Sequence, residues 1–276
     1  MTTTLIILAG GASSRMKKSI ATELSPEKLA QANQRSKGLI EVSGRPFLSY
    51  LLDNVVKAGF EDVIIITGEA AELFRSTYEN NTEFSKLNIK FATQYIPQGR
   101  EKPLGTADAV YQALTQYPEL KKQQFCVCNS DNLYTSEVFR LLKENQNRQA
   151  LIAYDREKLL YPKERIARFA VMRFVKNYRL AEIIEKPDHT KIAEYTDNDN
   201  KVRISMNIFL FDGEIFFDYL ENCPIHPVRN EKELPTAMTN MMADGHKIFG
   251  IPVGDHVPDL TSKEDIAKLE KYLNAN

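Results

Sequence analysis

Short apolar runs alternate with amphipathic stretches along the first half of this chain. The apolar runs cover residues 5–8, 62–67, 89–94 and 125–129, and each has the length of a buried strand. The stretches between them predict helices from Phe47 to a stop at Gly59, over about 69–80, and over 106–116. This alternation of strands and helices predicts a mostly parallel sheet that is covered by helices on both faces.

The second half is less regular. Strand-like segments cover 150–154, 169–175, 180–185 and 203–211, and the short link between the second and third of them predicts a hairpin. Ser262 and Asp265 have the spacing of a capping box and open a final helix. Residues 17–36 are polar and long for a connection, which is typical of a lid or a binding segment.

The chain contains no repeat, low-complexity tract or flexible linker that would divide it. We therefore expect a single domain over residues 1–276, with one half at 1–136 and the other at 137–276. The expected fold class is α/β, a three-layer α/β/α sandwich of Rossmann-like type. At 276 residues the chain is long enough to bury a large core.

Composition and charge limit the classes of partner that the chain can bind. The 36 Lys and Arg residues nearly balance the 37 Asp and Glu residues, for a formal charge of −1. No global basic field exists to hold nucleic acid or an anionic membrane. The N-terminal apolar run has four residues and no basic region before it, so we expect neither a signal peptide nor a membrane span, and a cytoplasmic location. A homo-oligomer is one candidate assembly, which the sequence does not decide.

Three cysteines fit a reducing compartment. Cys126 and Cys128 lie two apart in an apolar strand and therefore point to one face. No second Cys or His pair lies nearby at zinc spacing, so we interpret both as buried structural thiols.

Glycines, hydroxyls and an arginine follow the first predicted strand. Gly10 and Gly11 allow a tight turn with uncovered N–H groups, and the guanidinium of Arg15 offers a planar fork of donors. These features favour a binding site for a phosphate chain, although a Gly-Gly turn beside a solvated arginine has the same sequence. The run matches neither a Walker loop nor a dinucleotide fingerprint, because the lysine and the third glycine that these require are absent.

Two aspartates stand out for metal chemistry. Asp131 follows the predicted strand 125–129, at the edge where ligands bind in open α/β sheets. Asp259 lies in a short segment before the last helix. Each alone is also typical of a turn residue or a helix cap. Taken together with an anion-binding loop, they predict a two-aspartate Mg²⁺ site.

At this point the chain resembles the sugar-1-phosphate nucleotidyltransferases. The likeness rests on Leu8-Ala9-Gly10-Gly11 with Arg15-Met16, Lys37, Pro103-Leu104-Gly105-Thr106-Ala107-Asp108-Ala109, Ser130-Asp131-Asn132, Glu185-Lys186-Pro187, Ser205-Met206-Asn207 and Asp259, in that order. Cytidylyltransferases and molybdopterin-type nucleotidyltransferases share the opening motif. The pairing of Pro-Leu-Gly-Thr-Ala with a later Glu-Lys-Pro is much narrower. The sequence departs from the family pattern at Ser130, where glycine is common, and at Leu260, where Gly-Thr usually follows.

The resemblance implies a role for each matching residue on the nucleotide side. The backbone of Gly10 and Gly11 would hold the nucleotide phosphates together with Arg15 and Lys37. Lys28 is an alternative to Lys37, because the gap after Arg15 is long. The base would lie against Gln94 and Gly105, and the nucleotide pocket would also include Leu8 and Thr106.

On the metal and sugar side, the resemblance implies that Asp131 and Asp259 hold Mg²⁺. Glu185 would bind sugar hydroxyls, Lys186 the phosphate of the second substrate, and Asn207 the sugar. The half at 1–136 would then be the nucleotide-binding half and 137–276 the sugar-phosphate-binding half.

The implied reaction joins a nucleoside triphosphate (NTP) and a sugar-1-phosphate to give an NDP-sugar and pyrophosphate. The sugar-phosphate oxygen would attack the α-phosphorus in line, and no general base is needed because that oxygen is already ionised. Catalysis then rests on positioning and on charge neutralisation by Mg²⁺, Arg15, Lys37 and Lys186. Two alternatives stay open: a cytidylyl- or molybdopterin-type nucleotidyltransferase, and a nucleotide-sensing protein without turnover. The sequence names neither the sugar nor the base.

Overall fold

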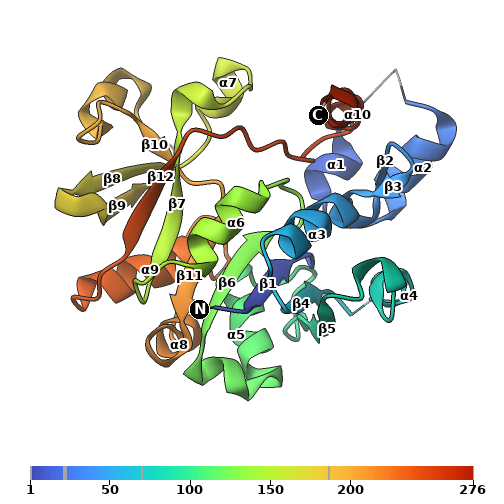
Figure 1. Ribbon diagram of the computed structural model, residues 1–276, viewed down its shortest axis with the longest axis horizontal. Coiled ribbons are helices and arrows are strands. Elements are labelled where there is room, and N and C mark those ends of the chain that lie inside the picture. Colours follow the sequence, from blue (N-terminus) through green and yellow to red (C-terminus); the bar gives the residue numbers. More distant parts are fainter. Residues whose placement is uncertain (1, 21–23, 70, 186, 276) are drawn as a thin grey trace.

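The computed structural model describes residues 2–20, 24–69, 71–185 and 187–275. Its centre is one ten-stranded sheet in the order β10-β8-β9-β12-β7-β11-β6-β1-β4-β5 (Figure 1). No helix among the described residues is both long and apolar enough to cross a membrane.

The elements have the following bounds. The strands of the main sheet are β1 (Thr4–Leu8), β4 (Asp62–Thr67), β5 (Asn88–Thr93), β6 (Gln124–Asn129), β7 (Ala150–Asp155), β8 (Val171–Val175), β9 (Arg179–Ile184), β10 (Arg203–Ile204), β11 (Ile208–Asp212) and β12 (Phe249–Val253). β2 (Glu41–Val42) and β3 (Arg45–Pro46) form a separate hairpin. The α-helices are α1 (Ser14–Lys18), α2 (Pro26–Gln34), α3 (Phe47–Lys57), α4 (Glu72–Tyr78), α5 (Thr106–Gln116), α6 (Ser136–Lys143), α7 (Lys163–Ile166), α8 (Gly213–Glu221), α9 (Leu234–Ala243) and α10 (Glu264–Ala275). Short 3₁₀ turns are η1 (Lys37–Leu39), η2 (Thr82–Phe84), η3 (Pro118–Lys122), η4 (Arg156–Lys158), η5 (Lys176–Tyr178) and η6 (His189–Tyr195).

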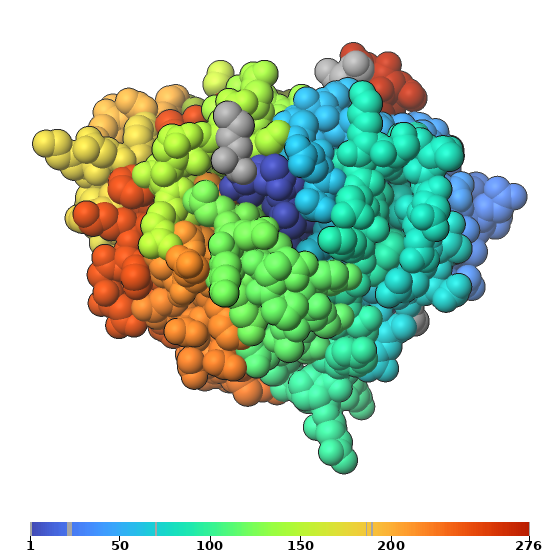
Figure 2. Space-filling view, turned by 60° about the horizontal axis from the view of Figure 1, so that its bottom comes forward, coloured from blue at the N-terminus to red at the C-terminus, as the bar shows by residue number. Residues whose placement is uncertain are grey.

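Successive residues of β1 face two different cores. Leu5 and Ile7 belong to the core that is shared with α3, α6 and α10. Ile6 belongs to the core that is shared with α5, α8 and α9. In Figure 2, α5 and the turn after it (green) lie between α8 (orange) and the segment around β5 (teal). A strand alternates its side chains across a sheet, so two cores mean two covered faces. The expected three-layer α/β/α fold is confirmed.

The sheet is parallel on one side and mixed on the other. β5, β4, β1 and β6 run parallel, and Leu8 pairs with both Ile66 and Asn129. The next strand, β11, runs antiparallel to β6 and to β7. Because β1, β4 and β6 end together, the loops that follow them share one edge of the sheet.

The predicted strand over 203–211 is divided in two. β10 ends at Ile204 and β11 begins at Ile208. The break is fixed at the Met206 carbonyl, which accepts hydrogen bonds from Asn132 at 2.9 Å and from the Tyr134 hydroxyl at 2.6 Å. Asn207 has a left-handed backbone with φ of 57°, a conformation that asparagine tolerates and that ends a strand. The predicted hairpin of β8 and β9 is confirmed.

Two further expectations can be compared with the structure. The polar stretch 17–36 contains the end of α1 and the whole of α2, and its residues 21–23 lie outside the described residues. Its role as a lid or a binding segment stays a prediction. α2 begins because Ser25 caps it and Pro26 stands at its first position. Cys126 and Cys128 are free and fully buried in the sheet, as predicted, and burial raises the pKa of both thiols.

Candidate active site

The loop after β1 leaves the sheet from a position fixed on both sides. The Ala9 N–H donates to the Ile66 carbonyl at 2.8 Å, and the Ser130 N–H donates to the Leu8 carbonyl at 3.1 Å. The first loop residues are therefore held between the ends of β4 and β6. A Cβ on Gly10 would lie 3.3 Å from the Thr67 carbonyl carbon, so the close approach of β4 favours glycine there.

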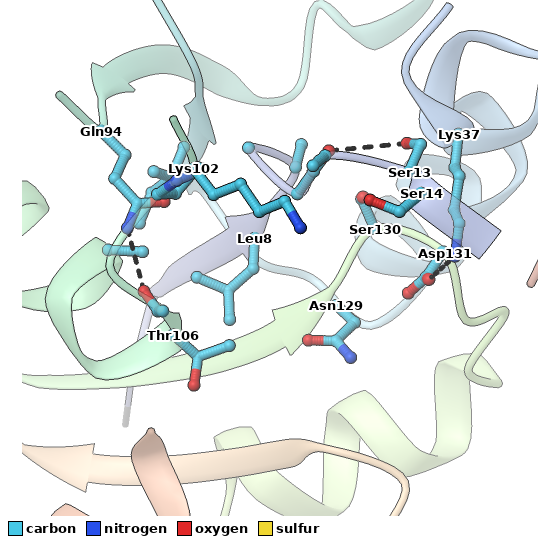
Figure 3. A pocket seen from close by; sticks show the side chains of 18 of the residues that line it. Leu8, Ser13, Ser14, Lys37, Gln94, Lys102, Thr106, Asn129, Ser130 and Asp131 are labelled. Atoms are coloured by element: carbon cyan, nitrogen blue, oxygen red, sulfur yellow. Dashed lines mark hydrogen bonds and ion pairs between the residues drawn. The ribbon is translucent and has the colours of Figure 1, made fainter. Parts of the chain in front are cut away.

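A cavity of about 370 Å³ opens at this edge (Figure 3). It is lined by Leu8, Ala9, Gly10, Gly11, Ala12, Ser13, Ser14, Arg15, Lys37, Ile66, Gln94, Lys102, Pro103, Gly105, Thr106, Ala109, Asn129, Ser130, Asp131 and Glu231. Every residue that was predicted on the nucleotide side, except the alternative lysine Lys28, is in this lining. Figure 3 shows Gln94 and Thr106 on one side of the cavity, and Lys37 and Asp131 on the other.

The loop side of the cavity suits an anion. A Cβ on Gly11 would meet no atom within 4 Å, so this stretch of backbone borders open space. Ser13 is left-handed with φ of 54° and precedes α1, whose first turn contains Arg15. Arg15 is exposed and lines the cavity. Uncovered backbone and a guanidinium thus face the same space, as phosphate binding requires.

Lys37 and Asp131 form an ion pair in the cavity wall. Lys37 Nζ lies 2.8 Å from Asp131 Oδ2, and their side chains are 12% and 24% exposed. Lys37 stands at the start of η1, and Asp131 follows β6. Lys28, the alternative phosphate lysine, donates instead to Glu270 at 2.6 Å and does not line the cavity. The pair places a cation and a carboxylate side by side at the end of β6.

Gln94 has a defined orientation at the other side. Its amide nitrogen donates to the Gly105 carbonyl and to Asp108 Oδ2, each at 2.9 Å. Both partners are hydrogen-bond acceptors, so the amide nitrogen of Gln94, and not its oxygen, must face them. Its Oε1 lies by Gly10, 3.4 Å from where a Cβ would stand. A group bound at this side therefore meets a hydrogen-bond acceptor.

Gly105 is required by its packing. It caps α5 with φ of 110°, and a Cβ would lie 2.4 Å from the Lys232 carbonyl oxygen. The Lys232 carbonyl accepts from the Ala107 N–H at 3.0 Å, and the Leu234 N–H donates to the Thr106 hydroxyl at 3.0 Å. The space where a Cβ of residue 105 would stand is thus filled by the segment before α9. Gly105 still lines the cavity through its backbone.

Asp259 lies near the Asp131 segment, and its carboxylate accepts hydrogen bonds from other side chains of the protein. Asp259 forms an isolated β-bridge with Asn132. Arg165 and the Tyr161 hydroxyl both contact its Oδ1, and the Thr261 hydroxyl donates to Oδ2 at 3.0 Å. Burial raises the pKa of Asp259, which Arg165 opposes. Asp259 is not in the cavity lining.

Two of the predicted sugar-side residues, Glu185 and Asn207, lie outside the cavity lining. Glu185 is exposed and accepts from Arg229 at 3.0 Å. Asn207 is exposed beside the break between β10 and β11, and its carbonyl accepts from the Tyr134 hydroxyl at 3.1 Å. Lys186 falls outside the described residues.

Two charged residues of the cavity were missed in the sequence. Lys102 extends over the cavity in Figure 3, and Glu231 lines it from the segment before α9. Lys102 directly precedes the Pro103-Leu104-Gly105-Thr106 run, and a lysine next to a predicted nucleotide motif is a usable signal. Glu231 has no such signal, because it reaches the site only through the contact of its segment with Gly105.

The carboxylates of the site differ in their fitness for a metal ion. Asp131 lines the cavity and presents oxygen, the ligand that Mg²⁺ prefers. Asp259 has both oxygens in contact with the protein's own donors. No cluster of three or more His, Cys, Asp or Glu that could hold a metal occurs in the part of the chain that the structure describes. Mg²⁺ commonly needs only one or two carboxylates with phosphates and water, so Asp131 fits this role.

An α/β/α sheet with a glycine-containing loop and a cavity at its strand ends has the arrangement in which proteins of the open-sheet class bind their ligands. The family model described as Nucleotidyl transferase matches residues 4–273, and the chain belongs to this family. The predicted family is thereby confirmed.

The curated relatives are longer proteins. The chain is similar to the bifunctional protein GlmU of Staphylococcus epidermidis, at 25% identity over 274 residues, which is 97% of this chain and 52% of GlmU. It is 26% identical to GlmU of Staphylococcus saprophyticus over 242 residues, which is 87% of this chain and 45% of that protein. The chain thus spans about half the length of the curated relatives it matches. A solved structure of UDP-glucose pyrophosphorylase with UDP-glucose has a TM-score of 0.71 over 100% of both chains, at 15% identity, and shows the shared fold.

Proposed function

We propose that this chain is a nucleotidyltransferase that joins an NTP and a sugar-1-phosphate into an NDP-sugar with release of pyrophosphate. The observation that carries the proposal is a cavity that combines the loop of Gly10, Gly11 and Arg15 with the Lys37–Asp131 pair and with Gln94. The names of the similar proteins, GlmU and UDP-glucose pyrophosphorylase, support a substrate of the sugar-phosphate class.

The cavity arrangement suggests an orientation for the nucleotide. Its phosphates would lie at the loop and its base between Gln94 and the backbone of Gly105 and Thr106. Arg15, Lys37 and Lys102 would offset the repulsion between the two anionic substrates, which is the main obstacle to transfer. The sugar-phosphate oxygen is already ionised at neutral pH, so the side chains need to align it and not to deprotonate it.

Asp131 would hold Mg²⁺ together with the nucleotide phosphates. The ion would neutralise charge on the phosphates when bound. Lys37 is then placed to keep Asp131 oriented toward the cavity and to contact the same phosphates. The sugar would bind on the side of Glu185, Lys186 and Asn207.

The test is pyrophosphate release from a grid of NTPs crossed with common sugar-1-phosphates, with Mg²⁺. Asp131→Asn should lower the rate by about 10²–10³-fold, because one preorganised charge contact is lost. Asp53→Asn is the matched control, since Asp53 also pairs with a cation but lies on α3 outside the cavity lining. Release that needs both substrates supports the transferase. NTP binding without release across the grid would favour the nucleotide-sensing alternative, and release with CTP and an acceptor other than a sugar phosphate would favour the cytidylyltransferase.

A further inference from the structure

The carboxylate of Asp259 is surrounded by donors from the protein itself. Its Oδ1 accepts from Arg165 and, at 3.1 Å, from the Tyr161 hydroxyl. Its Oδ2 accepts from the Thr261 hydroxyl at 3.0 Å. The side chain is 8% exposed. A buried carboxylate with a cationic partner and two hydroxyl donors has little capacity left for a metal ion.

Arg165 is held by more than this one contact. Its guanidinium also reaches both oxygens of Asp265, at 2.7 and 3.2 Å, and lies 4.6 Å from the centre of the Tyr161 ring. Asp265 is buried at the start of α10 and accepts from the Ser262 N–H at 2.7 Å. A guanidinium shared between two buried carboxylates and stacked on a ring is fixed in position. Moving it away would leave two buried charges without their cation.

This arrangement lies directly beside Asp131. The Leu260 N–H donates to the Asp131 carbonyl at 2.8 Å, and the Leu133 N–H donates to the Pro258 carbonyl at 2.8 Å. Asp259 therefore lies next to the Asp131 segment. The family resemblance gives Asp259 the role of a second metal ligand. The guanidinium that pairs with its carboxylate belongs to Arg165, a residue that none of the sequence motifs includes.

We propose that Arg165 is the resident cation of Asp259, and that Asp131 is the one described carboxylate that holds the divalent ion. The inference rests on the proposed function, because the remaining metal ligands would be nucleotide phosphates and water. Asp259 and Arg165 are then positioning residues, which tie α7 and α10 to the segment that presents Asp131. A metal held by one carboxylate that is also paired with Lys37 binds weakly until a nucleotide supplies phosphate oxygens.

The experiment measures Mn²⁺ binding by electron paramagnetic resonance, with and without UTP, dTTP, CTP, GTP or ATP. No sugar phosphate is added, so no transfer can occur. We expect Mn²⁺ to bind the wild-type protein appreciably only with a nucleotide. Asp131→Asn should weaken that binding by at least about tenfold, whereas Asp259→Asn should change it by less than about twofold. In Asp259→Asn the new amide oxygen can still accept from Arg165, which favours a folded variant.

Asp265→Asn is the matched control, because Asp265 contacts the same guanidinium from α10. Asp259→Asn and Asp265→Asn should both lower the thermal midpoint and leave Mn²⁺ binding intact. Equal loss of Mn²⁺ affinity in Asp259→Asn and Asp131→Asn would overturn the inference, as would tight Mn²⁺ binding without nucleotide. Both results would leave the proposed transferase standing, because pyrophosphate release in the substrate grid is measured separately.

Discussion

Gln94 donates its amide nitrogen to the carboxylate of Asp108 at 2.9 Å, within the wall of the cavity. Gln112 donates to the same carboxylate oxygen at 2.9 Å. Asp108 is 7% exposed and stands in the first turn of α5. Together with the Gly105 carbonyl, it fixes which end of the Gln94 amide faces the cavity.

This orientation predicts a preference among bases. Gln94 presents an acceptor, and we predict that it takes the ring N–H of uracil, thymine or guanine; cytosine and adenine offer a donor only in their exocyclic amino group, which stands at a different place on the ring. Asp108→Leu should reduce that preference by about tenfold, because the amide nitrogen of Gln94 loses one of its two acceptors. The measurement is kcat/KM for each NTP in both proteins. Gln116→Leu on the same helix is the control, and a wild-type preference for CTP or ATP would contradict the prediction.

The two candidate lysines should differ sharply in their effect on activity. Lys37→Met should lower kcat/KM by about 10²–10³-fold, because Lys37 lines the cavity and contacts Asp131. Lys28→Met should change kcat/KM by less than about threefold, because its ion pair with Glu270 is partly exposed. Steady-state kinetics with saturating sugar phosphate compares them. A large loss confined to Lys28→Met would reverse the assignment.

Replacing Gly105 by alanine should lower the stability of the fold, whereas replacing Gly11 by alanine should weaken nucleotide binding. Gly105→Ala combines a positive φ with a clash against the Lys232 carbonyl, and should cost at least about 2 kcal/mol in the free energy of unfolding. Gly11→Ala meets no neighbour within 4 Å, so the fold should be unchanged while KM for the nucleotide rises. Urea unfolding and nucleotide titration of both variants separate the two effects. A stable Gly105→Ala would show that the 231–233 segment moves easily.

His256 should make the protein less stable in mild acid. Burial, helped by nearby Arg165, lowers the pKa of His256 from 6.5 to about 4. Tyr161 and Tyr272 face its ring, and its Nδ1 accepts from the Leu160 N–H at 3.2 Å. Below pH 6.5 the His256 side chain binds a proton in the unfolded chain, whereas in the folded chain it stays neutral until about pH 4. The free energy of unfolding therefore decreases as the pH is lowered from 6.5 to about 4.

The test for His256 compares thermal midpoints between pH 7 and pH 4.5. His256→Gln should show a shallower decline than the wild type, because its side chain does not titrate. His246→Gln serves as the control and should keep the wild-type slope. Parallel curves for all three proteins would exclude His256 as the source.

The sheet and most of the polar residues that line the cavity could be predicted from the sequence because their signals are local. Apolar runs mark β1, β4 and β6, and the loop after β1 follows its strand directly. Gly10, Arg15 and Asp131 come together because the parallel strands that precede them end at one edge, which follows from the fold class alone. Lys37 stands on η1 and reaches this edge through its ion pair with Asp131.

The remaining features depend on contacts between distant segments. Arg165 and Asp259 are 94 residues apart, and no periodicity connects a guanidinium on α7 with a carboxylate before the last helix. Thr106 and Leu234 are 128 apart, so the requirement for glycine at 105 could not be attributed to the segment before α9. The division of 203–211 also has a distant cause, since Asn132 and Tyr134 hold the Met206 carbonyl.

The place of β11 in the sheet has a consequence for synthesis on the ribosome. β6 and the three strands beside it are complete once residue 129 has emerged, yet the outer edge of β6 pairs with residues 208–212. Until those residues emerge, the nascent chain exposes an unpaired apolar strand that includes Cys126 and Cys128. Unpaired edges of this kind invite pairing with other chains. We therefore expect the edge of β6 to be open to pairing with other chains during the interval in which β7 to β10 are being translated.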